Sequence, residues 1–148
     1  MDKKTHESFI EYLKHLIATN QVSGNIPAQI KPIVIAHFYN AEIYRSGIQS
    51  FFEVYPFSLE EVLNSFQILG VAPELIRVVE EANLHEYLTD DVLYKQEPDD
   101  EEKYEQLMEE RDLLWDNINE KYRCIANNDV DEKITDYIKT RNIDFGVE

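Results

Sequence analysis

The sequence predicts an all-α fold, organised as one domain of about six to seven helices over residues 1–148. Apolar residues recur at spacings of three and four in several segments, as they do along the buried face of a helix. Strict two-residue alternation is rare, and the chain has only four glycines and no hairpin signature. A chain of 148 residues is long enough to bury a core.

The first two helices are marked by apolar periodicity and by a proline. Residues 5–19 carry apolar side chains at helical spacing, and a loop rich in turn residues follows at 20–27. Pro32 suits the first turn of a second helix. This helix is apolar around most of its circumference as far as Tyr44, so we expect it to be the central, buried one.

Local sequence signals separate the helices of the middle region. Gly47 interrupts the second helix, and a short aromatic segment follows it. Ser58 and Glu61 form a capping-box pattern, which predicts the start of another helix. Gly70 stands where a left-handed C-terminal cap belongs, and Pro73 can open the next helix.

One long helix dominates the C-terminal third. A breaker region covers roughly 89–98, and the helix follows at about 99–126. A turn at 127–129 separates it from a final short helix over 130–140. At 100° per residue, the apolar side chains of the long helix share one arc and predict its core face, which consists of Tyr104, Leu107, Met108, Leu114, Trp115, Ile118, Tyr122 and Ile125.

The charge of the chain is strongly negative and unevenly distributed. The formal net charge is −16, and residues 97–148 alone hold 17 acids against 7 bases. Direct binding to nucleic acid or to an anionic membrane is disfavoured, because like charges repel. The charge favours a cationic partner, such as a basic protein, metal ions or polyamines; the alternative is that it serves solubility alone.

Other features of the composition indicate the cellular location. Cys124 is the only cysteine, so no internal disulfide can form and a reducing, cytoplasmic location is expected. No apolar run approaches the roughly 20 residues needed to span a bilayer. The first residues lack the apolar region and cleavage site of a signal peptide.

Carboxylates form a line on the long helix, nearly opposite its apolar face. They fall within an arc about 80° wide and spread over roughly 27 Å of helix. Like charges at this spacing destabilise a helix, whereas a directed negative field speeds the encounter with a basic surface. The line is therefore either a docking surface or simply a solvated face. Its members are Glu102, Glu105, Glu109, Asp112, Asp116 and Glu120, with Glu97, Asp99, Asp100 and Glu101 as an extension.

Three segments carry a resemblance to a known family. They are HFYNAEIYRSGIQSFF, LEEVLNSFQILGVAPELIRVVEEA and LLWDNINEKYRCIANNDVDEKITDYIKTR, and the resemblance that they carry covers about residues 33–141. The sequence resembles a bacterial domain family that includes a DNA mimic protein. The resemblance implies an all-helical fold, possible homodimerisation and, for at least one member, occupation of the DNA-binding site of a transcription regulator.

The chain departs from the family pattern in its first segment. Ser46 replaces a glycine, Arg45 stands where asparagine is common, and Ser50 stands where glutamine is common. Gly47, Phe51 and Phe52 match the family pattern. We interpret Gly47 as the cap of the second helix and the two phenylalanines as anchors in the core. The alternative is that the three residues line a ligand pocket.

Candidate reaction chemistry is sparse, and neither a catalytic residue, a cofactor nor a metal is assigned. His37 with Glu42, or Glu81 with His85, could contribute metal ligands, but neither pair has a third defined ligand. Cys124 lies at the edge of the apolar face and is expected to be a buried thiol. Phosphate-loop, dinucleotide-binding and nucleophile-elbow motifs are missing from the sequence.

The leading hypothesis is a non-enzymatic, acidic interaction module. It would bind a basic, nucleic-acid-binding protein by presenting aligned carboxylates in place of phosphates, without contacting nucleic acid or membrane itself. An immunity or antitoxin protein that inhibits a basic nuclease remains an alternative. A small enzyme or ligand-binding domain with a pocket near His37, Tyr44, Phe51 and Phe52 is another.

Overall fold

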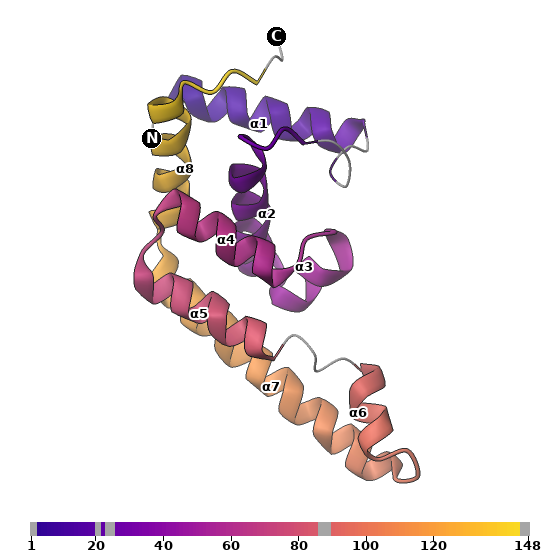
Figure 1. Ribbon diagram of the computed structural model, residues 1–148. Helices are drawn as coiled ribbons and strands as arrows, with labels where there is room; N and C mark the ends of the chain where they lie inside the picture. Colours follow the sequence, from indigo (N-terminus) through magenta and orange to yellow (C-terminus); the bar gives the residue numbers. More distant parts are fainter. Residues whose placement is uncertain (1–2, 20–21, 23–25, 86–89, 146–148) are drawn as a thin grey trace.

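The computed structural model describes residues 3–19, 22, 26–85 and 90–145, and these residues form eight helices and no strand (Figure 1). The all-α prediction is therefore confirmed. The helices are α1 (Lys3–Ala18), α2 (Lys31–Arg45), α3 (Ile48–Val54), α4 (Leu59–Leu69), α5 (Pro73–Leu84), α6 (Asp90–Gln96), α7 (Glu101–Ala126) and α8 (Asp129–Arg141).

Helix α2 lies at the centre of the molecule, as its apolar circumference predicts. It packs against α3, α4, α7 and α8, and Ile33, Val34, Tyr39 and Ile43 on it are fully buried. The ring of Tyr39 meets the edges or faces of Phe51, Phe66 and Tyr122 from three other helices, at centroid distances of 5.1 to 5.8 Å. Aromatic contacts of this kind add to the burial of apolar area in holding the helices together.

The predicted helix ends in the middle of the chain are also observed. The Ser58 hydroxyl accepts a hydrogen bond from the Glu61 amide at 3.1 Å, and the Glu61 carboxylate accepts one from the Ser58 amide at 3.2 Å. This is the reciprocal capping box. Gly70 adopts a left-handed conformation, with φ +73°, and Pro73 opens α5.

Two short helices were missed in the sequence. Helix α6 falls in the region expected to break helical structure, and α3 occupies the aromatic segment, so the count rises from about six or seven to eight. A helix of seven residues has too few turns to show a clear period and depends on tertiary packing. In α6 that packing comes from Leu93, which is buried where α6 meets α7.

Helix α7 extends beyond the body of the molecule. Figure 1 shows its second half running antiparallel to α5, while its first half projects outward with α6 folded against it. We call α6 together with the first half of α7 the arm. The predicted core face is buried at Trp115, Ile118 and Tyr122, but Ile125 is 39% exposed, which contradicts the prediction. Helical periodicity assumes a packing partner along the whole length of the helix, whereas this edge of α7 remains accessible to solvent at Ile125.

Candidate functional site: an acidic surface on α7

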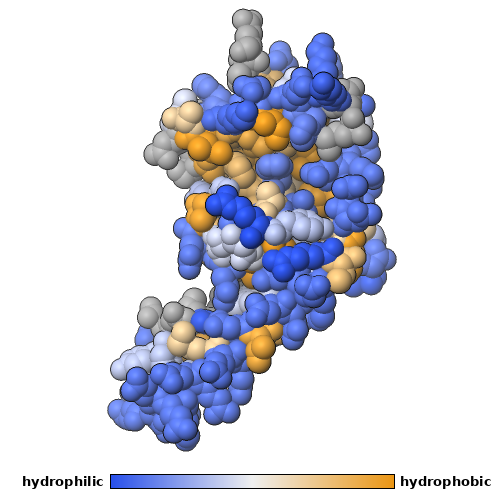
Figure 2. All heavy atoms as spheres, turned by 180° about the vertical axis from the view of Figure 1, so that it is seen from behind, coloured by the Kyte–Doolittle hydropathy of each residue, from blue (hydrophilic) through white to orange (hydrophobic). Residues whose placement is uncertain are grey.

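The six predicted carboxylates lie on one unbroken helix, and all six residues are exposed. We call them the acidic stripe: Glu102, Glu105, Glu109, Asp112, Asp116 and Glu120. Their spread over roughly 27 Å gives one charge per about 5.4 Å of helix axis. A strand of duplex DNA has a phosphate about every 3.4 Å. On the face seen in Figure 2, the arm presents mainly hydrophilic residues, with a few hydrophobic ones between them.

Basic neighbours compensate only part of the acidic stripe. Asp112 accepts hydrogen bonds from Gln49 Nε2 and Arg111 Nε, each at 3.1 Å, and Glu120 Oε2 lies 3.9 Å from Arg123 Nη1. The other four carboxylates are those of Glu102, Glu105, Glu109 and Asp116. They make no hydrogen bond or ion pair with any residue that the structure describes. Most of the stripe therefore keeps its charge available for a partner.

The predicted extension of the acidic stripe behaves differently. Asp100 is half-buried and caps α7, because its Oδ1 accepts a hydrogen bond from the Lys103 amide at 3.1 Å. Glu97 is half-buried as well, whereas Asp99 and Glu101 are exposed. Asp99 and Glu101 can thus lengthen the negative surface, while the carboxylate of Asp100 is committed to the helix terminus.

The corner between α2 and α3 holds α7 through polar contacts. Tyr122 donates its hydroxyl proton to Asn40 Oδ1 at 2.7 Å, and burial raises the pKa of this tyrosine well above its ordinary value. Arg123 donates from Nε and Nη2 to the Ile43 carbonyl at 3.1 and 2.7 Å. The Arg123 guanidinium therefore neutralises the C-terminal end of α2 and anchors α7 at the end of the acidic stripe.

Gly47 and Asn119 form the tightest part of this corner. The Ile48 amide, at the start of α3, donates to the buried Asn119 Oδ1 at 3.0 Å. Gly47 has φ +96°, and a Cβ there would stand 2.8 Å from Asn119 Nδ2. Only glycine fits such a conformation and such a contact. The helix cap expected at Gly47 is thus confirmed, since its amide also donates to the Glu42 carbonyl at 2.8 Å, whereas the role of Asn119 was not predicted.

The aromatic pair after Gly47 packs as anchors. Phe51 is fully buried, and Phe52 packs edge-on against Trp115 of α7 at 6.1 Å. Ser50 donates its hydroxyl proton to the buried Glu42 carboxylate at 2.7 Å. The serine that departs from the family pattern therefore satisfies a buried acid next to the same corner.

The four residues named for a ligand pocket do not share one. His37 faces a small cavity between α1, α2 and α8, whereas the Tyr44 hydroxyl reaches the Arg123 carbonyl at 3.4 Å. Phe51 is buried, and Phe52 lines a separate surface groove near the end of α1.

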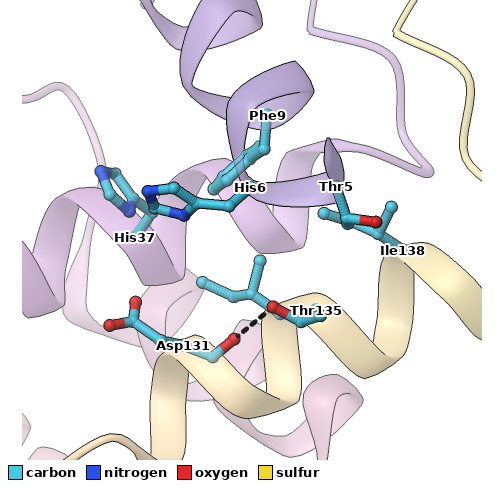
Figure 3. A pocket seen from close by; sticks show the side chains of 8 residues that line it. Thr5, His6, Phe9, His37, Asp131, Thr135 and Ile138 are labelled. Carbon is cyan, nitrogen blue, oxygen red and sulfur yellow. Dashed lines mark hydrogen bonds between the residues drawn. The ribbon is translucent and has the colours of Figure 1, made fainter. Parts of the chain in front are cut away.

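The cavity beside His37 has a volume of about 10 Å³, which is room for about one water molecule. Figure 3 shows the imidazoles of His6 and His37 close together, with Asp131 below them on α8. Burial lowers the pKa of His37; the Asp131 carboxylate opposes this shift, and His6 adds to it.

The candidate metal pairs are engaged in other contacts. Glu42 accepts from Ser50, and both Glu81 oxygens lie 3.1 Å from Lys121 Nζ. Among the described residues, no three or more His, Cys, Asp or Glu side chains gather as a metal site would require. Cys124 is exposed, contrary to the expected buried thiol, because its edge of α7 faces solvent; its Sγ lies 3.7 Å from Glu120 Oε1.

Comparison with known protein families shows which family the chain that carries this surface belongs to. The family described as DMP19-like protein matches residues 24–141, which include α2 to α8. The chain belongs to the DMP19-like protein family. The resemblance noted from about residue 33 to 141 is confirmed, and membership suggests a DNA-mimic protein. No curated protein and no solved structure matches the chain.

The DMP19-like match leaves α1 outside its boundaries and includes both the acidic stripe and the α2–α3 corner that holds it. Within the described ranges, the helices are too short or too polar to cross a bilayer.

Proposed function

We propose that this protein is a cytoplasmic DNA mimic that occupies the DNA-binding surface of a basic regulator. The acidic stripe would take the place of phosphates, and binding rather than catalysis would be its activity. The observation that carries the proposal is the line of exposed carboxylates on an unbroken helix that the α2–α3 corner holds in place. Membership of a family of DNA mimics supports it.

The spacing and rigidity of the stripe support this proposal over solubility alone. Scattered charges of both signs would keep the protein soluble without placing like charges one turn apart. The hydrogen bonds from the α2–α3 corner fix the second half of α7, so the backbone that carries Asp116 and Glu120 is already ordered before binding.

Two variants with the same change in net charge separate the effect of where the charges lie from the effect of how many there are. The stripe variant combines Glu102→Gln, Glu105→Gln, Glu109→Gln and Asp116→Asn. The control variant combines Glu7→Gln, Glu53→Gln, Glu80→Gln and Asp136→Asn, which are exposed acids on α1, α3, α5 and α8. Each variant removes four negative charges from the net −16.

The experiment is affinity capture from the native cell, followed by competition with duplex DNA for each captured protein. We expect the natural protein and the control variant to displace DNA, and the stripe variant to do so only at much higher concentration. A captured protein that holds DNA and this protein at the same time would contradict the proposal. A captured nuclease whose cleavage is blocked would assign the same surface to nuclease inhibition instead.

A further inference from the structure

A groove lies beside the acidic stripe, where α7 runs along α5. The groove is open to solvent, has a volume of about 460 Å³ and shares Glu120 with the stripe. Leu114 and Ile125 contribute apolar surface to it, and Ile125 is 39% exposed. Its lining consists of Glu81, Leu114, Asn117, Glu120, Lys121, Cys124 and Ile125.

Leu113 extends this apolar surface toward the stripe. It follows Asp112 on α7 and is 63% exposed. On the helical wheel it falls between Glu120 and Cys124 of the groove, about two turns nearer the start of α7. Single exposed apolar residues are common, but here two large ones flank a concave surface that is continuous with a line of charge.

The charge at the rim of the groove defines the partner that it can take. Lys121, which lines the groove, is held by both oxygens of Glu81, at 3.1 Å each, so its positive charge is neutralised. Glu120 and the stripe leave the combined surface negative. The same face of a second copy of this chain would bring the same charges and be repelled, as would an anionic membrane or nucleic acid.

We propose that the groove is the second part of the docking surface, and that it takes an apolar side chain from a basic amphipathic helix of the partner. This inference rests on the proposed function and deepens it. The stripe would speed encounter and set orientation, while burial of the apolar side chain would slow dissociation. DNA presents no such side chain and could not use the groove. A partner protein would therefore be recognised by its apolar side chain as well as by its charge.

Two synthetic peptides of equal length and equal lysine number test the inference. One is an amphipathic helix of lysine and leucine; in the other, glutamine replaces every leucine, so that charge is kept and the apolar face is lost. Their dissociation constants are measured by fluorescence anisotropy at low and high salt. The natural protein is expected to bind the leucine peptide about tenfold more tightly, the effect of burying part of one leucine side chain.

The protein variants then locate the effect. Leu113→Ser with Ile125→Ser should bind both peptides alike, whereas Ile68→Ser, which removes an apolar side chain 53% exposed on α4, should keep the tenfold preference. Equal binding of the two peptides by the natural protein would overturn the inference, as would a preference that survives in the double variant. The stripe variant should weaken both peptides and keep their ratio; unchanged affinity for both would instead contradict the proposed function.

Discussion

Replacing Gly47 with alanine tests the corner that holds α7. The backbone of Gly47 has φ +96° and ψ 173°, a conformation that is almost confined to glycine and costs other residues about 1–3 kcal/mol. The new Cβ would stand 2.8 Å from Asn119 Nδ2, so the Asn119 side chain must move. Its movement breaks the buried bond from the Ile48 amide, and an unsatisfied buried amide costs about 1–3 kcal/mol more.

The expected loss in the free energy of unfolding is therefore about 2–6 kcal/mol, a large part of the roughly 5–15 kcal/mol of a typical domain. Gly70→Ala is the matched control. Gly70 also has a positive φ, +73°, but its Cβ would meet no atom within 4 Å. Only the left-handed backbone is then disfavoured, at about 1–2 kcal/mol.

Urea unfolding followed by the fluorescence of Trp115 and by far-ultraviolet circular dichroism measures both losses. Trp115 is the only tryptophan and is buried against Phe52, so its emission reports on the contact of α7 with α3. In an Asn119→Ser background the Gly47→Ala loss should shrink, because the two changes remove the same interaction. A Gly47→Ala variant no less stable than Gly70→Ala would refute this account of the corner.

Three further predictions concern stability. Burial lowers the pKa of His37, so the folded protein binds fewer protons than the unfolded chain below the ordinary histidine pKa of about 6.5. The free energy of unfolding should therefore fall as the pH drops through that value, and His37→Phe should lose this part of the dependence in urea titrations. Asp100→Ala should lower the free energy of unfolding by about 1 kcal/mol, because it removes the cap of α7. Backbone amides in the first turn of α7 should then exchange hydrogen faster, and unchanged exchange would contradict the capping role of Asp100. The stripe variant should be more stable by about 1 kcal/mol, since repulsion between successive carboxylates is relieved; a less stable variant would show that these carboxylates support the fold.

The sequence predicts those features of the site that depend on local spacing. The acidic stripe follows from the helical period alone, and the caps at Ser58 and Gly70 follow from patterns within a few residues. Neither requires knowledge of what the helix packs against.

Features that depend on distant partners could not be predicted in this way. Asn119 is an ordinary polar residue in the sequence, and its partner Ile48 is 71 residues away. Leu93 belongs to a short polar segment and becomes a core residue only because α7 lies beside it. The errors at Ile125 and Cys124 have one cause: helical periodicity gives the side of a helix, but not where its neighbours end.

The salt dependence of partner binding distinguishes the alignment of charge on α7 from the total charge of the protein. The dissociation constant of the captured partner is measured over a range of salt concentrations for the natural protein, the stripe variant and the control variant. If the aligned carboxylates stand in for phosphates, the stripe variant will bind more weakly with a clearly smaller slope against the logarithm of salt concentration, while the control variant keeps the natural slope. Equal slopes for the two variants would show that total charge, and not its alignment on α7, governs the interaction.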